Sequence, residues 1–139
     1  MKKIFLSAVF ILLSGILIGQ TFQKGNLVGF HVGTITLNTD ATLEQWKHFA
    51  LETFLPAFNK EFDGEVIQYL SCGERGKFKD YIGIHIVFRS VEIRDKYISA
   101  EGMTTKLYAE KFAKVKPLWD ELEKIGVFSR DHFTDWVIQ

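Results

Sequence analysis

The chain has 139 residues, of which 47% are hydrophobic and 24% are charged, so it suits one folded domain with a substantial core and is not a disordered chain. Basic and acidic residues balance at 17 each, which leaves no excess positive charge for nucleic acid, and we expect no nucleic-acid partner. Cys72 is the only cysteine, which excludes an intramolecular disulfide and a zinc cluster built from several thiolates.

The first twenty residues have the pattern of an export signal. Lys2 and Lys3 precede an almost unbroken apolar run from Ile4 to Ile18. This run is short for a membrane span. We therefore expect residues 1–20 to be a signal peptide and the mature protein to be periplasmic or secreted. A membrane is expected as a partner only if this segment stays uncleaved.

The next part of the chain predicts a strand followed by a helix. Residues 26–37 are dense in β-branched and aromatic side chains and end at a polar turn. Thr42 and Gln45 then have the spacing of a capping box at a helix start. Apolar residues recur at spacings of three and four, as expected for one helix face: Leu43, Trp46, Ala50, Phe54, Ala57 and Phe58. Pro56 is expected to kink or shorten this helix, which ends at residues 63–64.

The remaining pattern predicts a hairpin, two helical segments and a last strand. Residues 65–72 and 81–89 read as two strands joined by a glycine-punctuated turn. A short helix is expected over residues 91–98 and a longer amphipathic one over residues 107–125, with Gly126 at its C-terminal cap. Residues 133–139 supply the last strand. The order strand, helix, strand, strand, helix, strand predicts an α+β, ferredoxin-like fold, with two helices on one face of a four-stranded antiparallel sheet.

Alternation along two strands suggests which side chains face the helices. Ile82, Ile84, Ile86 and Phe88 share one side of their strand, which leaves His85 and Val87 on the other. On the first strand, placing the apolar residues under the helices puts His31 on the opposite side. The prediction is that His31 and His85 lie together on the helix-free face, which also carries apolar side chains. Such a face is typical of an interface, so we expect a homodimer that joins these faces.

The element order resembles that of the dimeric α/β-barrel superfamily, and so do the local patterns FLPAF at residues 54–58 and FRSVE at residues 88–92. This superfamily includes antibiotic-biosynthesis monooxygenases and stress-responsive barrel proteins. The resemblance implies that residues 26–139 form one barrel domain, in which two sheets pack face to face. Many members have a histidine in the short helix after the third strand, where this chain has Lys96 and Tyr97.

The candidate ligand-binding residues are histidines and aromatic residues with polar groups. His31 and His85 read as a metal pair, a proton relay, a pH-sensitive dimer contact or two independent strand histidines, and two histidines without a placed carboxylate make a poor metal site. The aromatic stripes of the two long helices are either core or the wall of an apolar pocket, which Pro56 and Pro117 would help to open. The polar groups that would bind a ligand in that pocket belong to Tyr97, Tyr108 and Trp136.

The sequence shows no set of nucleophile, base and acid, so no catalytic residues are assigned. It also shows no set of metal ligands and no cofactor motif, so no cofactor is expected. Three functions stay open. The first is a protein that binds a small apolar or aromatic molecule between sheet and helices. The second is a cofactor-independent enzyme of the monooxygenase or isomerase kind. The third is a structural or assembly protein without a pocket.

Overall fold

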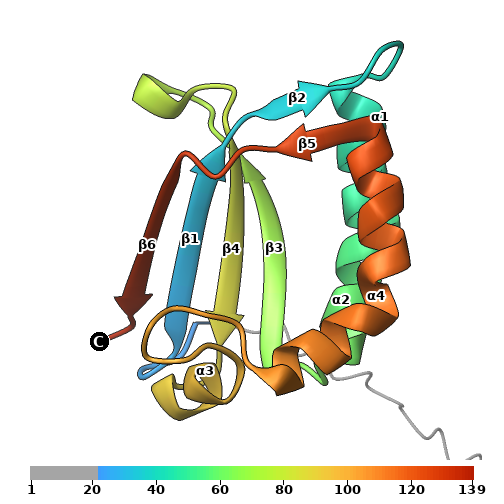
Figure 1. Ribbon diagram of the computed structural model, residues 1–139. Helices are drawn as coiled ribbons and strands as arrows, with labels where there is room; N and C mark the ends of the chain where they lie inside the picture. Colours follow the sequence, from blue (N-terminus) through green and yellow to red (C-terminus); the bar gives the residue numbers. More distant parts are fainter. Residues whose placement is uncertain (1–21) are drawn as a thin grey trace, which may run out of the picture.

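A computed structural model describes residues 22–139, so the expected signal segment, residues 1–20, lies outside the described part. Four strands form one antiparallel sheet: β1 (Leu27–Gly33), β3 (Val66–Cys72), β4 (Ile82–Phe88) and β6 (His132–Val137). Their order across the sheet is β3-β4-β1-β6, as Figure 1 shows. The hairpin expected between residues 65–72 and 81–89 is present as the antiparallel pair β3–β4.

The helices follow the strands in the expected order. A first helical stretch comprises α1 (Leu43–Phe49), the π-helical segment η1 (Ala50–Phe54) and α2 (Leu55–Glu61). After β4 come the short α3 (Val91–Tyr97) and the long α4 (Lys106–Ile125). Thr42 and Gln45 form the expected capping box, and Ser90 and Thr105 cap α3 and α4 through their hydroxyl groups. The chain therefore has the α+β, ferredoxin-like arrangement, in which a split βαβ order places the first strand in the middle of the sheet.

The π-helical segment explains how one helical stretch keeps its buried side facing the sheet. Five residues at intervals of four are all buried: Trp46, Ala50, Phe54, Phe58 and Phe62. In a regular α-helix each interval of four overshoots a full turn by about 40°, so four intervals would rotate the row by about 160°. The wider turn at η1, marked by the bond from the Leu55 N–H to the Ala50 oxygen, takes up part of this drift. Pro56 lies at the start of α2, where its missing N–H is tolerated.

A second, small sheet lies at one end of the molecule. β2 (Ile35–Leu37) pairs with β5 (Gly126–Phe128), which directly follows α4. The single strand expected over residues 26–37 is therefore two strands in two sheets. Gly126 caps α4 as expected and also begins β5, which the sequence pattern did not indicate. The turn between β3 and β4 contains a short 3₁₀ helix, η2 (Gly76–Phe78).

The register between β1 and β4 shows that the wrong side of β1 was expected to point towards the helices. His31 lies opposite Ile84, and Phe30 lies opposite His85. Because opposite residues in an antiparallel pair share a face, His31 points to the helix side and His85 to the helix-free side. The prediction that both histidines share one face was wrong, whereas the prediction for β4 was correct. The helix-free side of β1 carries Val28, Phe30 and Val32.

The main core lies between the helices and the β3–β4 part of the sheet. It is dominated by fully buried aromatic and aliphatic side chains: Trp46, Phe58, Phe62, Val66, Ile82, Tyr97 and Leu122. In Figure 1, α1, α2 and α4 stand at the β3 side of the sheet, and β6 forms the opposite edge. Every residue of β6 is solvent-exposed. Within residues 22–139, no helix has the length and apolar content needed to cross a membrane.

Candidate functional site

The aromatic layer between sheet and helices is densely packed. A small void in this layer measures about 10 Å³, which is room for about one water molecule. It is lined by Trp46, Ala50, Phe54, Leu55, Gln68, Leu70, Ile84, Trp119 and Leu122. Phe54 packs on Trp119 with a centroid separation of 5.3 Å, and Trp46 donates its indole N–H to the Gly126 oxygen at 2.9 Å. Pro56 and Pro117 do not hold the helices apart. This part of the helix side is core, and its void is too small for an organic ligand.

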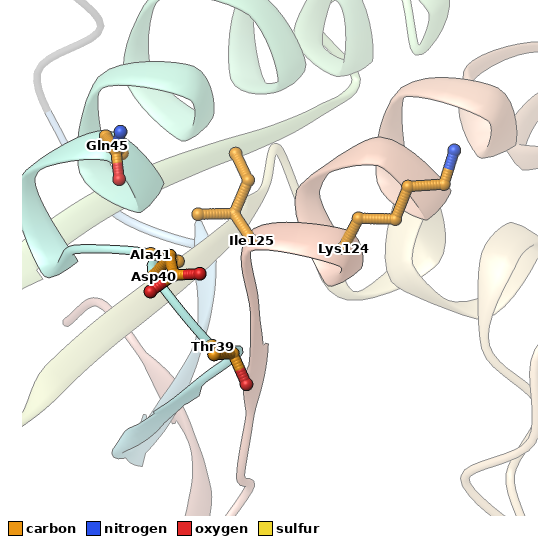
Figure 2. Close-up of a pocket in the computed structure, with 6 residues that line it drawn as sticks. All are labelled: Thr39, Asp40, Ala41, Gln45, Lys124 and Ile125. Carbon is orange, nitrogen blue, oxygen red and sulfur yellow. The ribbon is translucent and has the colours of Figure 1, made fainter.

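An open depression of about 330 Å³ lies at the end of the molecule where α1 begins and α4 ends. Figure 2 shows its lining residues, and the Lys124 side chain extends away from the others. Gln45 is engaged in the capping box of α1. The side chains around this depression do not converge on a common point, so we do not regard it as a binding site.

The helix-free face of the sheet consists of three rows that run across the four strands. From one end of the sheet to the other, the rows are Ile67–Val87–Val28–Trp136, Tyr69–His85–Phe30–Thr134 and Ser71–Gly83–Val32–His132. None of these residues is an aspartate, glutamate, lysine or arginine. Trp136 is 63% exposed and Tyr69 37% exposed. The face is thus apolar to weakly polar, with two large aromatic side chains open to solvent.

His85 lies in the middle row of this face and makes a specific side-chain contact. Its Nε2 lies 2.8 Å from the Ser71 hydroxyl oxygen, and its ring packs on Phe30 with a centroid separation of 4.4 Å. Gly83 makes room for this pair, because a Cβ there would lie 2.4 Å from the Ser71 oxygen. Burial lowers the pKa of His85 below its usual value, which favours the neutral imidazole. Ser71 was not among the sequence candidates, because nothing in its surroundings marks it before the register is known.

Of the two other candidates, Tyr97 lies in the core and Trp136 lies on the helix-free face with His85. Tyr97 is fully buried and donates its hydroxyl to Glu65 at 2.6 Å, and burial followed by this carboxylate raises its pKa. Its hydroxyl therefore already has a partner within the fold. Trp136 lies on the helix-free face, on the opposite side of the sheet from His31. The five candidates are consequently divided among the two sheet faces and the core.

His31 lies on the helix side of β1, in the part of the sheet that the helices leave open. Its ring packs on Phe133 of β6 with a centroid separation of 4.6 Å, and Phe133 is itself 62% exposed. The Nδ1 atom of His31 is buried, and no group in residues 22–139 lies within hydrogen-bonding distance of it. A buried polar atom without a partner is costly, which makes it unusual in a folded protein. Burial, with a smaller contribution from the charge of Arg130, lowers the pKa of His31 to about 4.

Arg130 lies in the loop between β5 and β6, close to His31. Ser129 and Asp131, on either side of it, donate backbone bonds to Thr34 and Val32 at 2.9 and 3.1 Å. A Cβ on Gly33 would lie 1.6 Å from the Ser129 oxygen. Since Gly33 and His31 share the helix side of β1, the loop crosses the sheet on that side, two residues from His31. The ion pairs of the described residues do not include Arg130.

The charge of Arg130 also acts on Tyr108 of α4, which lies in the helix layer. Burial raises the pKa of Tyr108, and the positive charge of Arg130 partly offsets this effect. The ring of Tyr108 packs on Phe62 and Phe112 with centroid separations of 5.2 and 5.8 Å, within the aromatic layer. On the other side of His31, Asp135 of β6 pairs with Arg94 of α3 at 3.6 Å. The charge of one arginine, which the sequence did not point to, thus acts on two sequence candidates, His31 and Tyr108. We call His31, Tyr108, Arg130 and Phe133 the His31 site.

Metal chemistry has no support in these side chains. Among the described residues, no group of three or more histidine, cysteine, aspartate or glutamate side chains is arranged to hold a metal ion. Gly29, the neighbour of His31 on the same side of β1, brings no ligand atom. The groups that the His31 site offers are an imidazole, a guanidinium, a phenol and a phenyl ring, which bind organic molecules through hydrogen bonds, charge and stacking.

Comparison with known proteins gives two structural neighbours. No family model and no curated protein matches the sequence. One neighbour is an uncharacterized NIPSNAP-like domain protein from Burkholderia xenovorans, with 14% identity, a TM-score of 0.42 and coverage of 84% of this chain and 86% of that one. The other is a dimeric protein of unknown function and ferredoxin-like fold from Bacteroides fragilis, with 10% identity, a TM-score of 0.41 and coverage of 85% and 100%. The ferredoxin-like assignment of this chain rests on its own strand order, and the resemblance to antibiotic-biosynthesis monooxygenases stays a prediction.

Proposed function

We propose that the protein is an exported binding protein that takes up a small aromatic or apolar molecule at the His31 site, between the sheet and α4. The observation that carries this proposal is the buried, unpartnered Nδ1 of His31. A ligand with one polar group would satisfy this atom, while Phe133 would supply an exposed ring for stacking. His31 and Phe133 do not line the small void of the packed aromatic layer, which is too small for such a ligand.

Binding is favoured over catalysis by the direction of the histidine pKa. General-base catalysis works best when the pKa of the base lies near the working pH. With its pKa lowered to about 4, His31 is a weak base at neutral pH, although it remains a good hydrogen-bonding partner in its neutral form. The enzyme alternative, a cofactor-independent monooxygenase or isomerase, would need a stronger base than this site offers.

The binding proposal is tested by thermal unfolding of the mature protein with a panel of small aromatic and apolar compounds. A compound present at one hundred times its dissociation constant should add about 2.7 kcal/mol to the free energy of unfolding. The His31→Phe variant keeps a ring at this position but lacks Nδ1, so it should lose the effect. His48→Phe is the matched control, since His48 lies exposed on α1, and it should keep the effect. No stabilisation by any compound, or equal stabilisation of His31→Phe, would reject the site.

A second proposal concerns assembly: the helix-free faces of two copies pack together in a homodimer. The face carries no formally charged side chain, and burial favours the neutral form of His85, so two copies meet without repulsion of like charges. It also presents Trp136 and Tyr69, the kind of aromatic side chain enriched in interfaces. A stable interface of this type buries about 1,600 Å² in total.

Light scattering at micromolar concentration tests the homodimer. The mature protein should have the mass of a dimer, and Tyr69→Lys should have the mass of a monomer, because an unpaired charge in an apolar interface is costly. Val127→Lys is the matched control, since Val127 is 46% exposed but lies on β5, away from this face, and it should remain a dimer. A monomeric wild type, or a dimeric Tyr69→Lys variant, would show that this face is not the interface.

Export is proposed on the basis of Lys2, Lys3 and the apolar run that follows them. Cell fractionation followed by N-terminal sequencing should find a mature protein outside the cytoplasm that begins close to residue 21. Recovery of the chain in the cytoplasm with Met1 intact would refute the proposal.

A further inference from the structure

The two outer strands of the four-stranded sheet differ in how their free edges are protected. β3 and β6 each have one row of backbone groups with which no strand of residues 22–139 pairs. On β3, the side chain of Asn59 from α2 occupies this row: it donates to the Gln68 oxygen at 3.1 Å and accepts from the Gln68 N–H at 2.8 Å. A side-chain amide thus takes the place of a neighbouring strand. Proteins commonly cover their edge strands, because free backbone groups would otherwise pair with another chain.

The backbone of β6 shows which of its residues face the free edge. The Ile138 N–H donates to the Asn26 oxygen at 2.9 Å, and the Ile138 oxygen accepts from the Gly25 N–H at 2.8 Å, so both groups of Ile138 point towards the β1 side. Backbone groups point to alternate sides along an antiparallel strand. The residues of β6 whose N–H and C=O groups point away from β1 are therefore Phe133, Asp135 and Val137.

This edge lacks the protection that β3 has. The Gln139 side chain donates to the Val137 oxygen at 3.2 Å, but the outward groups of Phe133 and Asp135 have no bonding partner among residues 22–139. Residues 132–137 contain no lysine, arginine or proline, the residue types that often protect an exposed edge. An extended chain can therefore form backbone hydrogen bonds along the middle of β6.

The side chains of the outward residues define what such a chain would meet. Phe133 and Val137 are 62% and 43% exposed, and both lie on the helix side of β6 with Asp135 between them. The Asp135 carboxylate lies 3.6 Å from Arg94, but Arg94 also pairs with Asp95 at 2.6 Å. One cation thus serves two carboxylates. The edge of β6 therefore presents two apolar side chains on either side of a partly compensated negative charge.

This arrangement of charge disfavours a second copy of β6 as the added strand. If two copies paired antiparallel with all three outward residues bonded, Asp135 would lie directly opposite its own copy, and like charges directly opposite each other destabilise a strand pair. A shift of the register by two residues would place each carboxylate opposite an apolar side chain, Phe133 or Val137. A chain with a positive charge at this position has neither disadvantage.

We propose that β6 binds an extended segment of another protein as an added antiparallel strand, with apolar side chains opposite Phe133 and Val137 and a basic side chain opposite Asp135. Backbone hydrogen bonds supply affinity in this mode of recognition, and alternate side chains supply specificity. The antiparallel direction continues the pattern of the sheet and is slightly more stable per residue than the parallel one. This inference is independent of small-molecule binding at His31.

Synthetic peptides of matched sequence test the partner chemistry. In acetyl-Thr-Val-Thr-Lys-Thr-Val-Thr-amide, the valines are spaced to lie opposite Phe133 and Val137 and the lysine opposite Asp135. A second peptide has glutamate in place of the lysine, and a third has a methyl group on the backbone nitrogen of the lysine. NMR titration of the mature protein should give the first peptide a dissociation constant about fivefold or more below that of the other two. A methyl group on the nitrogen of a neighbouring threonine, which points away from β6, should have a smaller effect.

Hydrogen exchange shows where the peptide binds. Bound peptide should slow the exchange of the Phe133 and Asp135 amides, whereas the Thr134 and Trp136 amides, which already face β1, should change little. Asp135→Asn should bind the lysine and glutamate peptides about equally. Glu74→Gln is the matched control, since Glu74 is exposed in the turn between β3 and β4, and it should keep the preference for lysine.

Three results would overturn the proposal. The first is that none of the peptides binds at millimolar concentration. The second is that the glutamate peptide, or the peptide methylated at the lysine nitrogen, binds as tightly as the first. The third is slow exchange of the Phe133 and Asp135 amides in the protein alone that becomes fast on dilution, which would show that a second copy occupies the edge.

Discussion

The helix side of the sheet has two halves that differ in what covers them. Over β3 and β4, the helices bury side chains such as Phe58 and Val66 to 0% exposure. Over β6, Phe133 and Val137 remain 62% and 43% exposed, although Leu27 on the same side of β1 is buried. The covered half contains closely packed hydrocarbon, whereas the open half contains an imidazole, a glycine pair and an arginine. One half stabilises the fold, and the other presents groups that have not found partners within it.

The largest difference between the halves should appear on removing an aromatic ring from each. Phe58→Ala deletes a fully buried ring that stacks on Phe62 at 4.3 Å and should lower the free energy of unfolding by about 3–5 kcal/mol. Phe133→Ala removes a ring of equal size from the open half and should cost less than about 1 kcal/mol, mostly the stacking on His31. Urea denaturation of both variants measures this. Equal losses would mean that β6 is covered in solution.

A smaller effect should distinguish the two glycines of the open half. Gly33→Ala places a methyl group 1.6 Å from the backbone oxygen of Ser129, so the loop that carries Arg130 must move, at a cost of about 1–3 kcal/mol. Gly29→Ala meets the Asp135 carboxylate at 3.0 Å, which a rotation of that side chain relieves, and should cost less than about 1 kcal/mol. Thermal unfolding of the two variants checks the order. A harmless Gly33→Ala would contradict the close crossing of loop and strand.

The smallest expected effect is the pH dependence that the open half contributes. The pKa of His31 is about 4 when folded, against an ordinary value of about 6.5 when unfolded. Between these two pH values the unfolded chain binds the proton more readily than the folded chain. The contribution of His31 to the free energy of unfolding is therefore complete above pH 6.5 and is lost as the pH falls towards 4. The charged group that acts on His31 is Arg130, and the carboxylate of Asp135, on the same side of β6 as Phe133, is paired with Arg94.

In His31→Phe this contribution, on the order of 1–2 kcal/mol after allowance for partial exposure, should disappear. His85, whose pKa burial also lowers, adds a slope of the same sign that the His31→Phe variant keeps. Denaturant titrations at pH 7, 5.5 and 4.5 compare the two proteins. Identical slopes in both would show that His31 is accessible to protons in the folded state.

The sequence predicted β4 well and β1 poorly for a clear physical reason. On β4 one side carries four large apolar residues, and only that side suits the core. On β1 the apolar residues Val28, Phe30 and Val32 pointed to the helix side, yet the register places His31 there, opposite Ile84. A shift of one residue in the register moves every side chain of a strand to the other face of the sheet. The register of the β1–β4 pair therefore decides which β1 side chains point towards the helices. The helix-free face buries Val28 and Val32 as well, so burial was not a guide to the helix side.

The site itself was partly predictable. His31 and Tyr108 were found because histidine and tyrosine combine apolar and polar character. Arg130 was not found, because a loop arginine near the end of a chain has no distinguishing pattern until Gly33 and Ser129 are seen in contact. The pairing of β2 with β5 was missed because each strand has only three residues and adjoins a longer element. For the aromatic stripes of the helices the sequence left two interpretations, core or the wall of a pocket, and the packed layer agrees with the first.

The wider turn of the η1 segment affects how this chain would be aligned with a chain that has a regular α-helix at the same place. A protein with the same sheet but an uninterrupted α-helix would reach the same buried position at Phe58 with one residue fewer. An alignment guided only by residue similarity would place that gap in the polar turn after the helix, and would shift every residue of α2 by one position. Aligning by burial instead places the gap between Ala50 and Phe54, where the wider turn begins and ends. The wider turn at η1 thus changes the number of residues per turn while the aromatic row from Trp46 to Phe62 stays buried.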